Sequence, residues 1–224
     1  MTPERHAKLQ RVLALRQPDL TVLMESVHKP HNLSAILRTC DAVGVLGVHV
    51  VPPRDGLELS SASAGGTAKW VTVTKHDDIR TAAARLRCRG FRIIAAHLDR
   101  TAVDYREEDY TGPTAFLMGT ELDGLTEAAL DNADRMVAIP MAGMVPSLNV
   151  SVATALLLFE AFRQRDARGF YDTPRLPEQE RTRLLFEWGY PRISRKLREL
   201  SEPYPSLDDN GAIMDSASLA ALID

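Results

Sequence analysis

The chain contains few cysteines and no long hydrophobic run. Its 224 residues include two cysteines, Cys40 and Cys88, which form no CxxC pair and have no cluster of histidines beside them. This excludes a disulfide framework and argues against a structural zinc site, so we expect no metal and a reducing environment. The longest apolar stretch, residues 150–159, contains two hydroxyl residues and is too short to cross a bilayer. Because the first 17 residues also lack the apolar centre of a secretory signal, we expect a cytoplasmic protein with no membrane partner.

The chain also lacks the glycine-rich motifs that bind phosphate groups in common nucleotide-binding folds. No GxGxxG follows the first predicted strand, and neither GxxxxGK[ST] nor GxSxG occurs in the sequence. A small-molecule dehydrogenase, a P-loop NTPase and an α/β-hydrolase therefore lack their signatures. The pair Gly65-Gly66 favours a tight turn over a phosphate site.

The net charge of −3 does not by itself favour a nucleic-acid partner, but the charges are unevenly distributed. Residues 1–16 and 163–198 are rich in arginine and lysine, whereas residues 97–135 and the last 26 residues are acidic. Two basic flanks around a core are typical of surfaces that bind nucleic-acid phosphates. Ordinary solvated helix faces would give the same pattern, so charge alone leaves both interpretations open.

Hydrophobic periodicity predicts strands that alternate with helices. Continuous apolar runs predict strands over 20–24, 47–51, 91–96, 115–118 and 136–139. Helices are predicted over 3–16, 32–44, 77–90, 126–133, from Ser147 or Leu148 to 168, and around 177–187 and 191–200. The fold class is therefore α/β, a mostly parallel sheet with helices on both faces. The expected domains are a basic N-terminal helical extension (1–19), the α/β domain (20–168) and a C-terminal helical extension with an acidic, frayed tail (169–224).

Three segments place polar residues in apolar surroundings, at or near the carboxyl ends of predicted strands. They are HNLSAILRTCD (31–41), FLMGTELDGL (116–125) and IPMAGMVPSLNVS (139–151). In open α/β sheets this edge is where ligands bind. Each segment also has a structural interpretation, because polar residues at such positions can be helix caps, local ion pairs or solvated loops.

Together the three segments closely resemble the signature motifs of SpoU-type RNA ribose 2′-O-methyltransferases of the SPOUT superfamily. Among these, the chain most resembles the bacterial tRNA guanosine-18 2′-O-methyltransferases, and the resemblance covers roughly residues 5–195. It implies a trefoil-knotted methyltransferase domain with short helical extensions, a homodimer, S-adenosylmethionine as the cofactor and tRNA as the partner. The implied reaction is methyl transfer to the ribose 2′-hydroxyl of guanosine 18 in the tRNA D-loop.

The resemblance also implies site residues. The expected catalytic residues are Arg38, Asn32, Glu121, Ser147 and Asn149. The expected cofactor-binding residues are Ala96, Met118, Gly119, Ile139, Met141 and Leu148. The expected RNA-binding residues are Arg5, Lys8, Arg11, Arg16, His31, Arg163, Arg165 and Arg175. The chain departs from the family pattern at two positions, Pro146 and Leu15, where we expect polar and basic residues.

The role of Arg38 stays open between two hypotheses. A guanidinium has a pKa above about 12, so it acts as a base only where its surroundings perturb it strongly. Otherwise it binds an RNA phosphate and fixes the ribose hydroxyl. We expect Asn32 to orient Arg38, and Ser147 and Asn149 to shape the third segment around the cofactor. We expect Glu121 either to hold the second segment or to engage an asparagine or arginine across the pocket.

Two other functions compete with the tRNA methyltransferase. The first is an rRNA 2′-O-methyltransferase on the same fold. Only about 20 residues precede the first predicted strand, which favours tRNA over rRNA enzymes that carry a separate N-terminal RNA-binding domain. The second is a non-catalytic RNA-binding protein on the same scaffold, which the intact set of polar site residues disfavours.

Overall fold

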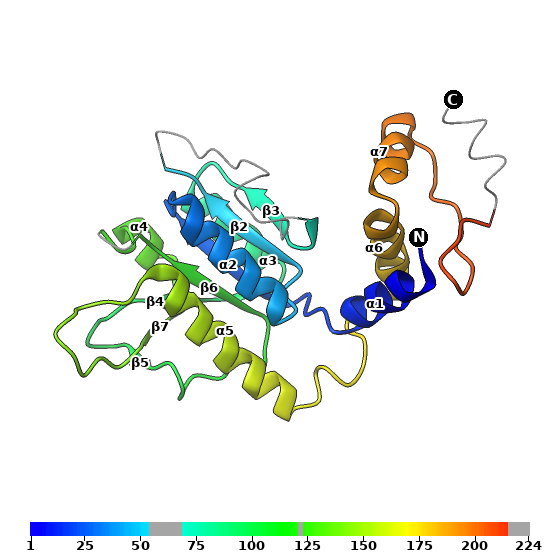
Figure 1. The fold of residues 1–224 in the computed structure, drawn as a ribbon. Helices are drawn as coiled ribbons and strands as arrows, with labels where there is room; N and C mark the ends of the chain where they lie inside the picture. Colours follow the sequence, from blue (N-terminus) through cyan, green and yellow to red (C-terminus); the bar gives the residue numbers. More distant parts are fainter. Residues whose placement is uncertain (54–68, 121–122, 215–224) are drawn as a thin grey trace. The chain divides into compact units, whose positions relative to one another are not determined.

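A computed structural model describes residues 1–53, 69–120 and 123–214. The chain divides into two compact units, Gln17–Phe170 and Met1–Arg16 together with Tyr171–Asp224. The two units are described separately below, and Figure 1 shows their elements. No described helix is long and apolar enough to cross a membrane.

The larger unit is built on a seven-stranded sheet with the order β3-β2-β1-β6-β4-β7-β5. All its strand pairs are parallel. The strands are β1 (Leu20–Glu25), β2 (Gly47–Val51), β3 (Thr72–Lys75), β4 (Arg92–Ala96), β5 (Val103–Asp104), β6 (Thr114–Met118) and β7 (Arg135–Ala138). Because the strands are parallel, the loops that follow them all leave from one edge of the sheet.

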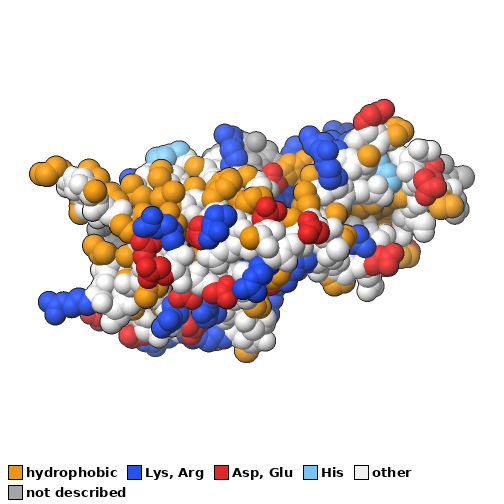
Figure 2. Space-filling view, turned by 90° about the horizontal axis from the view of Figure 1, so that it is seen from below, with side chains coloured by type: hydrophobic (Ala, Val, Ile, Leu, Met, Phe, Trp, Pro, Cys, Tyr) orange, Lys and Arg blue, Asp and Glu red, His pale blue; other side chains and the backbone are white. Residues whose placement is uncertain are grey.

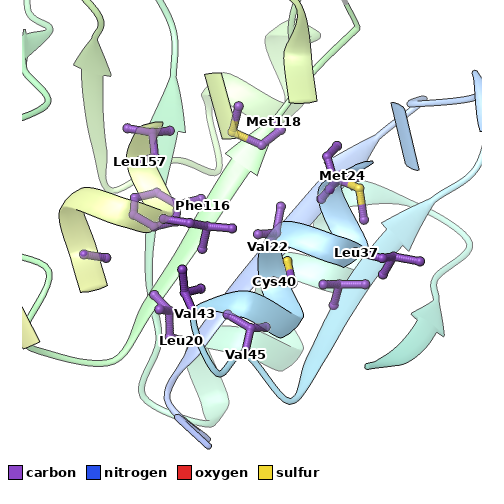
Figure 3. Close-up of a cluster of buried hydrophobic side chains, with 14 of the residues drawn as sticks. Leu20, Val22, Met24, Leu37, Cys40, Val43, Val45, Phe116, Met118 and Leu157 are labelled. Atoms are coloured by element: carbon purple, nitrogen blue, oxygen red, sulfur yellow. The ribbon is translucent and has the colours of Figure 1, made fainter. Parts of the chain in front are cut away.

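Helices cover both faces of this sheet, as the sequence predicts (Figure 1). On one face, α2 (Pro30–Ala42) and α5 (Val150–Ala167) pack against alternate strand residues such as Val22 and Phe116. Figure 3 shows this cluster, in which Cys40 lies among the buried side chains. On the other face, α3 (Ile79–Cys88) and α4 (Glu127–Leu130) pack against the intervening residues. The strands are apolar throughout because both of their faces are buried.

The smaller unit consists of α1 (Pro3–Ala14), α6 (Glu178–Gly189), α7 (Pro191–Leu200) and the segment up to residue 214. Its buried apolar residues include side chains from all three helices and Leu176, which precedes α6: Leu9, Leu13, Leu176, Leu184, Phe186, Trp188 and Leu197. The ring of Tyr204 stacks on Phe186 with centroids 4.7 Å apart. The N-terminal amino group donates to the Tyr190 hydroxyl at 2.6 Å. The N-terminal helix thus belongs to the same compact unit as the C-terminal helices.

Some element boundaries differ from the predicted ones. Helix α2 begins at Pro30, two residues before the predicted start at Asn32, and its N-cap Lys29 makes no side-chain cap. Helix α5 is capped by Asn149, not by Ser147. The cap of α4 by Thr126 is confirmed. Strands β3 and β5 were not predicted, because the first is polar and largely exposed and the second has two residues. The trefoil knot remains a prediction of the resemblance.

Candidate active site

A cavity of about 660 Å³ lies at the carboxyl edge of the sheet, in the larger unit. Its walls come from the ends of β4, β6 and β7 and from the start of α5. All six predicted cofactor-binding residues line it: Ala96, Met118, Gly119, Ile139, Met141 and Leu148. The predicted catalytic residue Ser147 and the divergent Pro146 line it as well. Residues from the second and third polar segments, which are distant in sequence, therefore meet around one space.

A tight backbone loop after β6 forms one wall of the cavity. Thr120 and Gly124 exchange two backbone hydrogen bonds, at 3.0 and 3.2 Å. A Cβ on Gly119 would lie 2.1 Å from the carbonyl oxygen of Gly124, a distance that real side chains do not reach. Gly124 itself has a φ of +68°, which favours glycine. The two glycines let the loop fold closely on itself and present backbone groups to the cavity.

Asn149 joins the first polar segment to the third. As the N-cap of α5, its Oδ1 accepts from the Ser151 backbone N–H at 2.8 Å and from the Ser151 hydroxyl at 2.6 Å. Its Nδ2 donates to Oδ1 of Asn32 at 3.1 Å. Asn32 is buried, with 3% of its surface exposed. Two predicted catalytic residues are thus in direct contact, and one of them fixes the start of α5.

A second, smaller cavity of about 60 Å³ adjoins the first. It is lined by Ser26, Val27, His28, Lys29 and Asn32, and it shares Thr120, Asp123 and Val150 with the larger cavity. From the sequence, the turn at residues 28–30 is only a connection between a strand and a helix. The sequence offers one signal for this turn, a histidine and a lysine three and four residues after the end of a buried strand, near the ligand-binding edge.

Arg38 lies on the exposed side of α2. Among the described residues its guanidinium has no hydrogen bond or ion pair, with Asn32 or with any other side chain, and it lines neither cavity. The contact between Asn32 and Arg38 that we expected is therefore not made within one chain. Glu121, another predicted catalytic residue, lies outside the described residues.

Arg165, which the sequence predicts as an RNA-binding residue, is fully buried instead (0% exposed). Its Nε donates to the carbonyl of Tyr110 at 2.9 Å, and its Nη1 donates to Oε1 of Gln17 at 3.2 Å and Oδ1 of Asp19 at 2.7 Å. Its Nη2 donates to the carbonyls of Asp19 and Gly112, at 3.1 and 2.8 Å. Because all five N–H groups are used inside the unit, RNA has no donor to reach, and the prediction is wrong for this residue.

Arg16 is also buried, with 1% of its surface exposed, and its guanidinium lies 5.2 Å from the centre of the Trp188 ring. This cation–π contact and its burial place it outside the candidate RNA surface. The remaining predicted RNA-binding side chains are exposed, apart from the half-buried Arg175: Arg5, Lys8, Arg11, His31 and Arg163. Arg163 pairs with Glu160 at 2.6 Å, a contact in which the arginine side chain is 65% exposed and the glutamate side chain 10% exposed.

Among the described residues, no three histidine, cysteine, aspartate or glutamate side chains converge on a point that would hold a metal ion. The walls of the larger cavity instead combine apolar side chains with exposed backbone groups. This composition suits an organic ligand more than an ion.

Comparisons with known proteins agree with this geometry. Residues 19–159 match the SpoU rRNA Methylase family, and residues 163–216 match the SpoU rRNA methylase C-terminal family. The tRNA (guanosine(18)-2′-O)-methyltransferase of Escherichia coli K12 is 51% identical over 215 residues, which cover 95% of this chain and 94% of that protein. The enzyme of the same name from Thermus thermophilus is 53% identical over 187 residues, covering 84% and 96%.

Solved structures show the same relationship. The TrmH/SpoU tRNA modifying enzyme of A. aeolicus superposes with a TM-score of 0.78 at 41% identity, covering 84% of this chain and 96% of that one. The SpoU methyltransferase AviRb from Streptomyces viridochromogenes, in complex with the cofactor AdoMet, superposes with a TM-score of 0.60 at 28% identity, covering 67% and 62%. On its sequence, its parallel sheet and the segments that line its cavity, the chain belongs to the SpoU methylase family.

Proposed function

We propose that the chain transfers a methyl group from S-adenosylmethionine to the ribose 2′-hydroxyl of a tRNA guanosine, at position 18 in the D-loop. The observation that carries this proposal is the cavity at the carboxyl edge of the sheet, which residues of the second and third polar segments line together. The names of the E. coli and Thermus relatives support the substrate, since this chain aligns with nearly their whole length.

The larger cavity fits the cofactor in size and chemistry. A volume of about 660 Å³ lies within the range of small-molecule sites, and its walls include the apolar side chains of Met118, Ile139 and Leu148. When bound, S-adenosylmethionine supplies a methyl group that its positive sulfur already activates. The chain therefore has to hold the cofactor, exclude water and place the ribose hydroxyl in line with the methyl group.

In this account, Asn149 and Asn32 fix the geometry and Arg38 acts on the RNA. The Asn32–Asn149 hydrogen bond holds the start of α5 at the cavity wall. Arg38 presents an exposed guanidinium, which suits a phosphate of the substrate. Binding that phosphate would fix the neighbouring 2′-hydroxyl, whereas a role as general base would need a strongly perturbed pKa.

We also propose that the active enzyme is a homodimer. Arg38 lines neither cavity of its own chain, so a second copy is needed to bring a guanidinium to the site. The outer face of α5 carries Val152 and Phe159, which are 47% and 52% exposed, and Figure 2 shows hydrophobic side chains gathered on the face that it views. An apolar helix face of this kind is typical of a protein–protein contact.

Each of the two units, taken by itself, carries exposed cations that this proposal assigns to tRNA binding. Arg5, Lys8 and Arg11 lie on one helix, α1, and His31 begins the helix that carries Arg38. Phosphate contacts by such residues position the RNA without reading its bases. A cytoplasmic location follows from this substrate and is part of the same proposal.

An rRNA substrate is the second candidate, because the matching family is described as an rRNA methylase family. One rRNA relative, the 23S rRNA (guanosine-2′-O-)-methyltransferase RlmB of Pseudomonas syringae, is 38% identical over 67% of this chain but only 61% of that protein. The tRNA relatives, by contrast, align over 94% and 96% of their own length at 51% and 53% identity, which favours tRNA.

The test is methylation of bulk tRNA and of rRNA with labelled S-adenosylmethionine. We expect label in tRNA and little in rRNA, and the opposite result would favour the second candidate. In the Arg38→Lys variant we expect transfer to fall about a hundredfold, because a lysine cannot donate bidentately. If binding of the cofactor is absent in calorimetry, the chain is a non-catalytic RNA-binding protein and the proposal fails.

A further inference from the structure

The last residue of β1, Glu25, is a buried carboxylate, with 5% of its surface exposed. Neighbouring residues on a strand point to opposite faces, so Glu25 points to the same face as Leu23, which packs with α3 and α4. A buried carboxylate is costly unless hydrogen-bond donors satisfy it. Its donors are therefore informative about its role.

Both of its carboxylate oxygens accept hydrogen bonds from one residue, Thr126. The backbone N–H of Thr126 donates to Oε2 at 2.9 Å, and the Thr126 hydroxyl donates to Oε1 at 2.8 Å. The same hydroxyl accepts from the backbone N–H of Ala129 at 3.1 Å, as the N-cap of α4. Because the Thr126 hydroxyl has only one proton, the hydrogen bond to the carboxylate fixes the direction of that O–H bond. A lone pair of the hydroxyl oxygen then remains to accept from the Ala129 N–H.

Thr126 ends the loop that forms a wall of the larger cavity. The loop starts at Gly119, directly after β6, and Thr120 and Gly124 tie its two arms together. Strands β1 and β6 are neighbours in register, with Met24 beside Met118. Glu25 therefore lies one residue after Met24, whose partner Met118 directly precedes the loop. The side chain of Glu25 holds Thr126, at the other end of the loop.

The backbone of Glu25 leads directly into the wall of the smaller cavity. The next residue, Ser26, has a φ of +55°, a conformation that is strained for any residue other than glycine. Ser26 lines the smaller cavity together with Lys29. One buried carboxylate thus connects the turn after β1 with the loop after β6. These two segments form the two cavities that share Thr120 and Asp123.

We propose that Glu25 is a positioning residue for methyl transfer. Through Thr126 it holds the described cavity-lining residues Gly119, Thr120, Asp123 and Gly124 in the positions that receive S-adenosylmethionine, a role that rests on the proposed function. The carboxylate matters, because each of its two oxygens accepts from one of the two Thr126 donors. A glutamine in its place offers one acceptor and sets an NH₂ donor against the second Thr126 donor.

The test measures binding of S-adenosylmethionine by calorimetry, without tRNA, in Glu25→Gln, Thr126→Val and the double variant. We expect each single variant to raise the dissociation constant of the cofactor about tenfold, the effect of losing a charged hydrogen bond at the wall. The dissociation constant of the double variant should be no higher than that of the single variant that binds the cofactor less tightly, since both changes disturb the same contact. Thr126→Ser keeps the hydroxyl and should bind like the wild type.

Glu108→Gln is the matched control. Glu108 is a similarly buried carboxylate (6% exposed), but it pairs with Arg92 at 2.8 Å and with Arg135 at 3.5 Å, and it lines neither cavity. We expect this variant to lower the unfolding temperature without changing the dissociation constant of the cofactor. The KM for tRNA should stay the same in the Glu25 and Thr126 variants, while the KM for S-adenosylmethionine rises.

Two results would overturn the proposal. The first is wild-type affinity for the cofactor in folded Glu25→Gln and Thr126→Val. The second is an equal loss of affinity for the cofactor in Glu108→Gln, which would show a general effect of lower stability. A wild-type chain that does not bind the cofactor would overturn the proposed function itself, and with it this role of Glu25. If Glu25→Gln does not fold, Thr126→Val alone decides, because Thr126 is exposed and its backbone N–H remains.

Discussion

Asn149 donates a hydrogen bond to Asn32 at 3.1 Å and thereby joins two segments that are 117 residues apart in the sequence. The same side chain caps α5 through Ser151. One residue therefore stabilises a helix and closes the contact between two polar segments of the site. These two effects can be separated by experiment.

We predict that Asn149→Ala and Asp78→Ala lower the free energy of unfolding by similar amounts, about 1 kcal/mol, because each removes an N-cap. Asp78 caps α3 by accepting from the Thr81 N–H at 2.8 Å, and it does not line either cavity. Only Asn149→Ala should also lose methyl transfer, by at least about tenfold. Urea unfolding and initial rates measure both effects. Equal rates in the two variants would contradict a role for Asn149 beyond capping.

A buried arginine should behave differently from an exposed one. Arg165→Ala removes the hydrogen bonds that the guanidinium donates to the Asp19 carboxylate and to three carbonyl groups, so we predict a loss of about 3–5 kcal/mol in the free energy of unfolding. Lys8→Ala, on the exposed side of α1, should leave stability unchanged and weaken tRNA binding, with a shallower dependence on salt. Chemical unfolding and filter binding at several salt concentrations distinguish the two. A stable Arg165→Ala with weakened tRNA binding would restore Arg165 to the RNA surface.

Gly119→Ala should disturb the wall of the larger cavity, which Gly119 lines. The new Cβ would lie 2.1 Å from the Gly124 carbonyl oxygen, so the loop has to open. We predict a dissociation constant for S-adenosylmethionine at least about tenfold higher. Gly112→Ala is the control, since its Cβ meets nothing within 4 Å. Unchanged cofactor binding in Gly119→Ala would show that the loop is not part of the binding wall.

A histidine pair away from the site should make stability depend on pH. Nδ1 of His49 and Nε2 of His76 lie 2.8 Å apart. Burial, with the neighbouring His76 and Arg89, lowers the pKa of His49 from 6.5 to about 4, and burial likewise lowers the pKa of His76. Below pH 6.5 the unfolded chain therefore binds protons that the folded chain does not.

The stability of the folded chain should thus be complete above pH 6.5 and should be lost progressively as the pH falls to about 4. In His49→Gln the free energy of unfolding should fall less over the same range. Urea unfolding at a series of pH values gives both curves. Parallel curves for the wild type and the variant would mean that His49 does not contribute to this dependence.

The sequence was sufficient for much of the fold, for identifiable physical reasons. Strands such as β1 and β6 are buried on both faces, so each reads as a continuous apolar run. Strand β3 was missed because it is polar, and three of its four residues are exposed, which resembles a loop. The start of α2 was placed too late because Asn32 resembles a cap, whereas Pro30 begins the helix.

The site was predictable in its parts but not in its contacts. The resemblance indicated Met118 and Leu148 separately, and the parallel sheet explains why they line one cavity. No sequence pattern connects Glu25 with Thr126, because the two are 101 residues apart and the carboxylate ends an apolar run. Arg165 was misassigned because a basic residue near a helix end usually faces solvent, and its partners become visible only in three dimensions.

The most direct test of the proposed reaction compares two synthetic tRNAs that differ in one oxygen. One carries guanosine at position 18 and the other carries 2′-deoxyguanosine there, and both are incubated with the chain and labelled S-adenosylmethionine. We predict that the first tRNA accepts one methyl group, mapped to the ribose of that guanosine, and that the second accepts none. Equal labelling of both tRNAs would place the methyl group elsewhere and contradict ribose 2′-O-methylation at this position.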